Sequence, residues 1–255
     1  MTIPLGLNDI ERQIRLESDA VRDGNFRHAK NREYHLYLPL YNQVQWMEIG
    51  LPADAGLSWK SPSGEKPIVV YGTSIVQGGC ASRPGMAWTG IVERELRQPL
   101  INFAFSGNGR LEKEVIDFIT EIDAKLYVLD CLPNLTGRPA EEIEDLVMKA
   151  VIQIRTKHPS PILLVEYAGY TDGLVDRKNY ESFSRANKAS ETACKKLIRQ
   201  SVTNIYYLSC AEINMPMDGT VDSVHPTDYG MRVYANAYEK IIRKILNEKT
   251  RSAKE

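Results

Sequence analysis

The sequence lacks any long apolar run. Its longest runs, such as residues 161–165, are far shorter than the roughly 20 residues that a membrane-spanning helix needs. The chain also lacks an excess of one charge, because 32 Lys and Arg residues stand against 33 Asp and Glu residues and give a net charge of −1. Such a balance creates no general attraction to nucleic acid or to an anionic membrane. We therefore expect neither a nucleic-acid partner nor a membrane span.

Cysteine is scarce as well. Paired cysteines in a C-x-x-C spacing are the usual signature of a structural zinc site, and the sequence has no such pair. A chain of 255 residues buries enough apolar surface to fold without disulfide bridges. We therefore expect no zinc site, and four buried free thiols at Cys80, Cys131, Cys194 and Cys210.

The start of the chain lacks the features of a secretory signal. Its first seven residues, Met-Thr-Ile-Pro-Leu-Gly-Leu, include no basic stretch followed by an apolar core. We expect either a cytoplasmic protein or a chain that begins after the processing of a secreted or periplasmic one.

What the sequence does contain is a regular alternation of strand and helix patterns from about residue 66 onward. Short apolar runs, typical of parallel strands that are covered on both faces, alternate with stripes of helical spacing. This alternation predicts a three-layer α/β domain built on a five-stranded parallel sheet. The predicted strands are residues 68–71, 100–105, 126–129, 162–165 and 205–208. The carboxyl ends of such strands share one rim, where ligands bind.

The first 65 residues have a different pattern. Residues 34–40 and 44–49 alternate apolar and polar side chains on either side of Asn42-Gln43, which predicts a β-hairpin. This segment is too short and too charged for a full domain. We therefore predict a β-rich appendage over residues 1–65 and a catalytic domain over residues 66–255.

A serine follows the first predicted strand, in the sequence Gly72-Thr73-Ser74-Ile75. In that position its hydroxyl would be exposed on the rim, as a nucleophile requires, although a turn or helix-capping serine would look the same. The motif is not the α/β-hydrolase elbow G-x-S-x-G, because Val76 replaces the second glycine. No Gly-Lys-Ser/Thr follows, which also excludes a P-loop.

Two further blocks follow the second and third strands. The first contains Gly107 and the second contains Asn134. Each could be a turn residue, but a backbone N–H and a side-chain amide are also the donors that an oxyanion hole employs.

The fourth block follows the last strand and contains Asp222 and His225. Of the four histidines, only His225 lies on the predicted rim. Asp222 stands three residues earlier and can reach its Nδ1–H, which leaves Nε2 to accept a proton. A structural histidine remains an alternative, and Asp218 is a weaker candidate for the carboxylate.

Taken together, the four blocks resemble the SGNH (GDSL-like) hydrolase superfamily. Ser74, Gly107, Asn134 and His225 match its four named residues, and Asp222 matches the carboxylate of its Asp-x-x-His pattern. Residues 72–86 and the run Asp130 to Asn134 are similar to a branch of bacterial SGNH esterases with an N-terminal β-sandwich domain. The front half of that domain is not recognisable here, so residues 1–65 resemble a partial remnant. The resemblance implies a flavodoxin-like fold.

The resemblance also implies an activity. It points to a serine ester hydrolase with the triad Ser74, His225 and Asp222, and with an oxyanion hole formed by the Ser74 and Gly107 N–H groups and the Asn134 amide. Its substrates would be small acyl, notably acetyl, esters of carbohydrate-like molecules, and no cofactor would be required. A lipid or thioester acylhydrolase and an inactive carbohydrate-binding relative remain alternatives. A cysteine enzyme using Cys80 or Cys131 is a weaker one, and Arg83 could contact substrate or anchor its loop.

Overall fold

The structure, a computed structural model, describes residues 6–7, 10–11, 35–50, 61 and 63–246. The chain divides into two units, Met1–Ser63 and Gly64–Glu255. In the first unit two short strands, β1 (Gly6–Leu7) and β2 (Ile10–Glu11), pair antiparallel. That this unit is a β-sandwich remnant stays a prediction.

The hairpin predicted over residues 34–49 is wrong for the described part of that segment. Residues 35–50 form no strand, and only Trp46 makes an isolated β-bridge. Of the apolar side chains that produce the alternation, Leu36, Leu38 and Trp46 are exposed and the other described ones are half-buried. An isolated hairpin is marginal unless one face packs against another element, and within residues 35–50 no side chain is buried.

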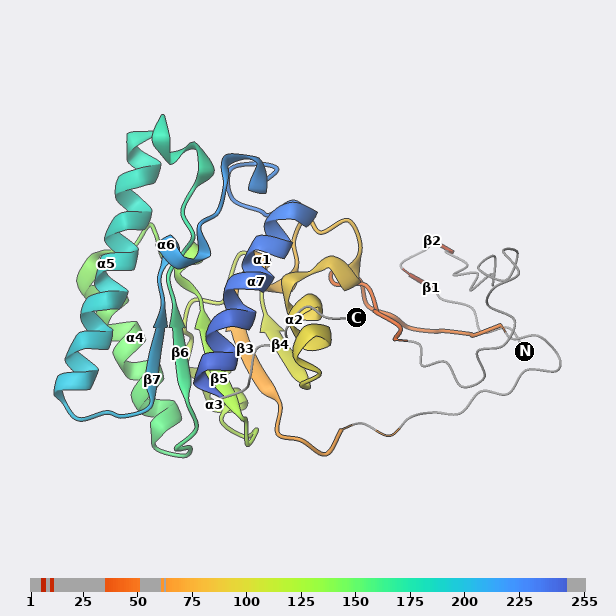
Figure 1. The fold of residues 1–255 in the computed structure, drawn as a ribbon, viewed down its shortest axis with the longest axis horizontal. Coiled ribbons are helices and arrows are strands. Elements are labelled where there is room, and N and C mark those ends of the chain that lie inside the picture. Colours follow the sequence, from red (N-terminus) through yellow and green to blue (C-terminus); the bar gives the residue numbers. More distant parts are fainter. Residues whose placement is uncertain (1–5, 8–9, 12–34, 51–60, 62, 247–255) are drawn as a thin grey trace. The chain divides into compact units, whose positions relative to one another are not determined.

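The second unit contains the predicted parallel sheet (Figure 1). Its five strands run in the order β4-β3-β5-β6-β7, with every neighbouring pair parallel. In chain order this is the 2-1-3-4-5 arrangement of flavodoxin-like folds, so the predicted fold class is confirmed. The strands are β3 (Ile68–Gly72), β4 (Leu100–Ala104), β5 (Leu126–Asp130), β6 (Ile162–Val165) and β7 (Ile205–Leu208).

Helices cover both faces of the sheet. Helices α2 and α7 pack together on one face, whereas α3, α4 and α5 pack in sequence on the other. The helices are α1 (Ser74–Gln77), α2 (Trp88–Leu96), α3 (Lys113–Ile119), α4 (Ala140–Arg155), α5 (Arg177–Arg199), α6 (Cys210–Ile213) and α7 (Asp228–Ile245). Short 3-10 turns lie in the connections at the rim: η2 (Pro84–Met86) after α1, η3 (Leu132–Asn134) after β5, η4 (Thr171–Leu174) after β6 and η5 (Met217–Gly219) after α6. Within the described residues, no helix combines the length and apolarity needed to cross a membrane.

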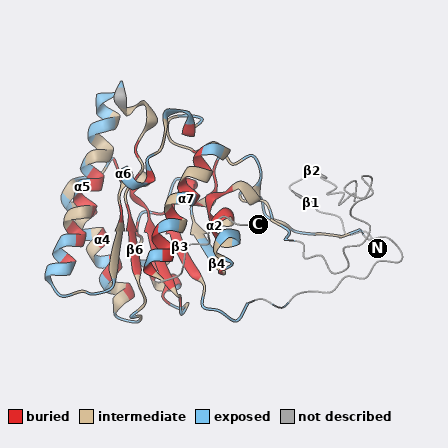
Figure 2. Ribbon diagram, in the orientation of Figure 1, coloured by how far each residue is buried: buried red, intermediate tan, exposed pale blue. Residues whose placement is uncertain are grey.

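Burial explains why the apolar runs form strands. Every residue of β3, β5 and β6 is buried, whereas the edge strand β4 is partly exposed (Figure 2). Continuous apolar sequences are stable only where helices cover both faces of a strand. On the helical side, the rings of Trp88 and Tyr238 stack with centroids 3.9 Å apart, which joins α2 to α7.

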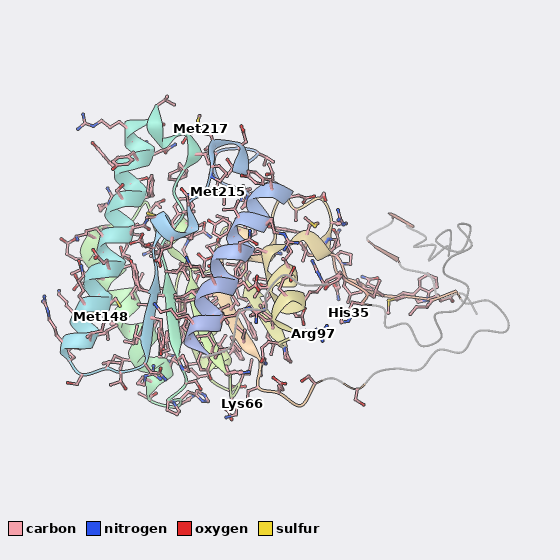
Figure 3. The ribbon with its side chains drawn as sticks, viewed as in Figure 1. His35, Lys66, Arg97, Met148, Met215 and Met217 are labelled. Atoms are coloured by element: carbon pink, nitrogen blue, oxygen red, sulfur yellow. The ribbon has the colours of Figure 1, made fainter. Side chains whose placement is uncertain are left out.

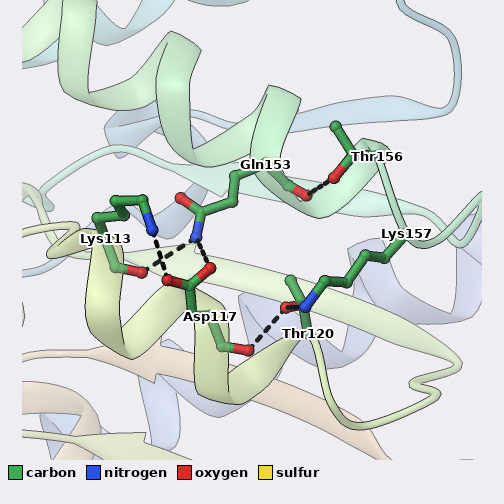
Figure 4. Close-up of polar contacts among 6 residues, drawn as sticks. All are labelled: Lys113, Asp117, Thr120, Gln153, Thr156 and Lys157. Carbon is green, nitrogen blue, oxygen red and sulfur yellow. Dashed lines mark hydrogen bonds and ion pairs between the residues drawn. The ribbon is translucent and has the colours of Figure 1, made fainter.

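Polar side chains join α3 to α4 at the helix surface (Figure 4). The Gln153 amide donates to the Lys113 carbonyl and to the Asp117 carboxylate, at 3.0 and 2.6 Å. Lys113 also donates to Asp117 at 2.6 Å, and Lys157 donates to Thr120 at 3.0 Å. Exposed contacts of this kind add little stability individually, so the apolar stripe beneath them dominates the packing.

All strands point the same way, so their carboxyl ends form one rim. Lys66, just before β3, lies at the opposite end of the sheet from Met215 and Met217, which belong to the rim loops (Figure 3). The four sequence blocks follow β3, β4, β5 and β7. The topology therefore gathers them at one end of the domain.

Candidate active site

Ser74 lies in a tight turn between β3 and α1. It is the first residue of α1 and is 7% exposed, and the side chain of Thr73 caps the helix. The turn leaves no room at Gly72, where a Cβ atom would lie 2.3 Å from Val76 Cγ2 and 2.7 Å from the Asp130 carbonyl oxygen. Glycine is therefore required at this position, and the close packing fixes the direction of the serine that follows.

His225 contacts both of its predicted partners. Its Nε2 atom lies 2.8 Å from Ser74 Oγ, and its Nδ1 atom lies 2.7 Å from Asp222 Oδ2. A neutral ring that donates Nδ1–H to the carboxylate has a lone pair on Nε2 for the serine hydroxyl. This is the tautomer that a general base requires.

The Asp222 carboxylate is held by the loop that contains it. Its Oδ1 atom accepts hydrogen bonds from the backbone N–H groups of His225 and Val224, at 2.7 and 3.1 Å. Partial burial acts to raise the pKa of Asp222, but the bonds from His225 and Val224 outweigh it and hold the pKa below its usual range. The carboxylate that contacts the ring is thus that of Asp222 and not that of Asp218. The backbone carbonyl oxygen of Asp218 accepts a hydrogen bond from the Thr227 hydroxyl.

The His225 loop is a small bridged turn. Thr220 and Pro226 form an antiparallel β-bridge, and the N–H of Val221 donates to the His225 carbonyl at 2.9 Å. Thr171, from the loop after β6, donates its N–H to the Ser223 carbonyl at 3.0 Å. These bonds fix the histidine from its own loop and from a neighbouring one.

The loop after β4 contains Gly107 in a left-handed conformation, with φ of +73°. Its carbonyl oxygen accepts a hydrogen bond from Arg110 at 2.8 Å, and the space around the position of a Cβ atom is open. Gly109, also left-handed, approaches the nucleophile turn so closely that a Cβ atom would lie 2.0 Å from the Gly72 carbonyl oxygen. This loop therefore packs directly against the Ser74 turn.

Asn134 ends η3, after β5, and its side-chain amide donates to the Asn108 carbonyl oxygen. The contact joins the loop after β4, which contains Gly107, to the turn after β5, which contains Asn134. One of the two amide N–H groups remains for another acceptor, because a primary amide has two donors. Asn134 is thus connected to the Gly107 loop. Among the described residues, no hydrogen bond joins Asn134 to Ser74.

One contact near the site was missed by the sequence reasoning. The Asp228 carboxylate accepts from the Ser82 N–H and hydroxyl, at 2.8 and 2.5 Å, and so fastens the loop after α1 to the start of α7. An acidic residue beside the N-cap Thr227 was the available signal. Arg83 lies 3.9 Å from Asp228 and is 69% exposed, which fits a loop anchor whose guanidinium still faces solvent.

The cysteines do not fit a nucleophilic role. The prediction of four buried thiols is wrong for Cys80, which is exposed, and for Cys210, which is half-buried. Burial raises the pKa of the Cys131 thiol, and burial together with the charge of Asp222 raises that of Cys80. Nucleophilic cysteines need a lowered pKa, so neither thiol is a rival to Ser74.

Two family models match parts of this sequence. The model of the GDSL-like lipase/acylhydrolase family matches residues 65–243. The chain belongs to this family. A second model, described as the N-terminus of Esterase_SGNH_hydro-type, matches residues 10–57 of this GDSL-like chain. A search among curated proteins found no match.

Several solved structures resemble this one. A protein described as a GDSL-like lipase, from Bacteroides ovatus, is 36% identical with a TM-score of 0.78, and the match covers 85% of this chain and 64% of that one. The salicylyl-acyltransferase of a tetracycline biosynthetic pathway is 22% identical, with a TM-score of 0.67 and coverages of 83% and 64%. A family two carbohydrate esterase from Clostridium thermocellum is 14% identical, with a TM-score of 0.58 and coverages of 79% and 71%. The last two show the fold alone, and this chain spans less than two thirds of the length of the first two relatives.

Proposed function

We propose that this protein is a serine carboxylic ester hydrolase in which Ser74 is the nucleophile, His225 the base and Asp222 the orienting carboxylate. The observation that carries the proposal is the unbroken chain of contacts from Ser74 Oγ to His225 and on to Asp222, at 2.8 and 2.7 Å. A nucleophile, a base and an orienting group within hydrogen-bond reach are the arrangement that serine hydrolysis needs.

In the first half of the reaction the Ser74 oxygen attacks the ester carbonyl. His225 Nε2 takes the hydroxyl proton and then gives it to the alcohol as the ester C–O bond breaks, which leaves an acyl group on Ser74. Asp222 is ionised at neutral pH, since its pKa is lowered, so it stabilises the imidazolium that forms between these transfers. In the second half a water molecule loses a proton to His225 and attacks the acyl group, and Ser74 regains its proton as the acid leaves.

The negative charge on the carbonyl oxygen needs donors. The backbone N–H groups of Ser74 and Gly107 and the free amide N–H of Asn134 are our candidates. Supporting this assignment, Gly109 packs the Gly107 loop against the Ser74 turn and Asn134 bonds to the same loop. Donors fixed before the reaction stabilise the transition state without reorganising during it.

For the substrate we propose small acyl esters of hydroxylated, carbohydrate-like alcohols. Arg83 is exposed on the loop after α1, and Arg110 is exposed on the loop after β4. Both side chains suit an alcohol with several hydroxyl groups. The carbohydrate esterase of Clostridium thermocellum shares the fold and lends support by analogy.

A labelling experiment tests the catalytic proposal. A fluorophosphonate probe should modify Ser74 and no other serine, as read by peptide mass spectrometry, and Ser74→Ala should lose at least about 10⁴-fold in kcat. Ser82→Ala is the matched control, since it removes a nearby hydroxyl that bonds to Asp228 instead of His225. Labelling at another serine, or an active Ser74→Ala enzyme, would exclude the mechanism.

A chain-length series tests the substrate class. The enzyme should hydrolyse p-nitrophenyl acetate faster than the butyrate and octanoate, and should release acetate from peracetylated sugars. A preference for octanoate would favour a lipid acylhydrolase instead. Fluorophosphonate labelling without turnover of any of these esters would indicate a different acyl or alcohol group.

A further inference from the structure

A buried carboxyl group ends β5, the strand that leads to Asn134. Asp130, the last residue of β5, is 2% exposed. The Tyr238 hydroxyl of α7 donates to its Oδ2 atom at 2.6 Å, across 108 positions of sequence. Tyr238 is itself buried, and its ring is stacked on Trp88. Burying a carboxyl group costs free energy unless the group is hydrogen-bonded or paired.

The Asp130–Tyr238 hydrogen bond connects two parts of the site. Beyond Asp130 the chain runs through η3 to Asn134, the proposed amide donor. At its other end, α7 begins at Asp228, three residues after His225. The backbone carbonyl of Asp130 also packs against Gly72 in the nucleophile turn. Asp130 therefore contacts Gly72 in the nucleophile turn through its backbone, and α7, the helix that follows His225, through its carboxyl group.

We propose that Asp130 is a positioning residue for the catalytic centre. Its carboxyl group, through the hydrogen bond to Tyr238, fixes the position of the helix that follows His225 relative to the strand that leads to Asn134. This role rests on the proposed ester hydrolase function. Asp130 does not touch the reacting atoms. It acts through the relative placement of the base and the amide donor, on which the rate depends steeply.

The surroundings of Asp130 favour its uncharged form. Within the described residues, the titratable groups that its charge reaches are Tyr234 and Tyr238 on α7, Tyr167 after β6, and the adjacent Cys131. None of them is a cation. Burial raises the pKa of Asp130 to about 7, although the hydrogen bond from Tyr238 acts in the opposite direction. Between the value of an unfolded Asp, near about 4, and this value, the folded protein retains a proton that the unfolded chain has already lost.

This difference has a measurable sign. An unfolded Asp titrates near about 4. Between about pH 4 and pH 7 the native state holds one more proton than the unfolded state, so the free energy of unfolding should decrease as the pH rises. Above about pH 7 both states have lost the proton, and this contribution to the slope should vanish.

The first arm of the test is urea unfolding between pH 4 and pH 9. Between pH 4 and pH 7 the free energy of unfolding should decrease less steeply in Asp130→Asn than in wild type. The difference in slope should correspond to one bound proton. Tyr238→Phe keeps the ring on Trp88 but removes the hydrogen bond that the Asp130 carboxyl group accepts within the described part of the chain. The decrease in its free energy of unfolding should therefore extend to higher pH. Tyr234→Phe is the matched control, because Tyr234 is a buried tyrosine of the same helix and, among the described residues, makes no hydrogen bond to Asp130.

The second arm measures positioning. With p-nitrophenyl acetate, Tyr238→Phe should lose roughly 10- to 100-fold in kcat with little change in KM, and Tyr234→Phe should stay close to wild type. Asp130→Asn should restore most of the rate that Asp130→Ala loses, since an amide oxygen still accepts from Tyr238.

If the free energy of unfolding has the same pH dependence in wild type and Asp130→Asn, Asp130 does not retain a proton in the folded state. If Tyr238→Phe and Tyr234→Phe have equal kcat values, Asp130 has no positioning role. The unfolding arm uses no substrate, so it decides the Asp130–Tyr238 link even if no ester is hydrolysed. Absence of esterase activity in wild type, in contrast, would count against the proposed function itself.

Discussion

The side-chain amide of Asn134 donates a hydrogen bond to the backbone carbonyl of Asn108. These two residues belong to the turns after β5 and β4, strands that lie on either side of β3 in the sheet. The contact therefore spans the end of the strand that leads to Ser74. It gives Asn134 a structural role beside the one proposed in the oxyanion hole, and the two roles predict different consequences.

Replacement of Asn134 by Ala should lower kcat by about 10²–10³-fold and leave KM nearly unchanged, because a donor to the developing oxyanion is lost. It should also lower the free energy of unfolding by about 1 kcal/mol, because the bond to Asn108 is lost. Steady-state kinetics and urea unfolding measure the two effects. Thr136→Val is the control, since it removes a hydrogen bond to Tyr170 nearby and should reduce stability alone. If Asn134→Ala behaves like this control, Asn134 is not an oxyanion donor.

The assignment of the carboxylate can be tested by a pair of substitutions. Asp222→Asn should lower kcat by up to about 10⁴-fold with the fold intact, because the ring then adopts the wrong tautomer. Asp218→Asn should retain nearly full activity, since its side chain does not hold the ring. Circular dichroism checks the fold, and kcat is measured for both variants at one pH. A larger loss in Asp218→Asn would reverse the assignment.

The Asp222 carboxylate should also contribute a pH-dependent stability. Its folded pKa lies below its usual range, so the contribution is fully present above the unfolded value near about 4. It is lost as the pH falls through the folded pKa. Urea unfolding between pH 2.5 and pH 6 should show a weaker acid-side decrease in Asp222→Asn than in wild type. Parallel curves for the two proteins would mean that the hydrogen bonds to Asp222 do not favour its ionised form.

Two left-handed glycines of one loop should respond differently to alanine. At Gly107, with φ of +73°, a Cβ atom meets nothing, so only the backbone conformation is strained and the loss should be about 1–2 kcal/mol. At Gly109, with φ of +67°, the Cβ atom would also lie 2.0 Å from the Gly72 carbonyl, which adds about 1–3 kcal/mol. Thermal unfolding and kcat measure both variants. Equal effects would show that the loop does not rest on the Ser74 turn.

Gly230 in the first turn of α7 allows a similar test of the His225 loop. A Cβ atom there would lie 1.9 Å from the Gly219 carbonyl oxygen and 2.9 Å from Pro226 Cβ. Gly230→Ala should therefore destabilise the protein by roughly 1–3 kcal/mol and reduce kcat by displacing His225. Gly137→Ala, where a Cβ atom meets nothing within 4 Å, is the matched control and should change neither quantity. A stable, fully active Gly230→Ala enzyme would show that the loop can move without consequence.

Much of the fold was determined by local sequence patterns. The runs at residues 68–71 and 162–165 are apolar throughout, and both form strands buried on two faces. A different pattern, the alternation of apolar and polar side chains, predicted strands within residues 35–50 that do not form, because alternation describes only what a strand would require. Whether a sheet face exists to receive those side chains depends on other parts of the chain.

The sequence by itself also determined the short-range part of the candidate site. Asp222 and His225 are three residues apart, so a single turn brings carboxylate and ring together, and their pairing could be predicted from spacing. Only the tertiary structure decided that His225 Nε2 reaches Ser74 Oγ across 151 positions, and that the Asp130 carboxyl meets the Tyr238 hydroxyl across 108. Those contacts depend on how the helices pack against the sheet, and that packing follows from the burial of many side chains at once, which no local motif encodes.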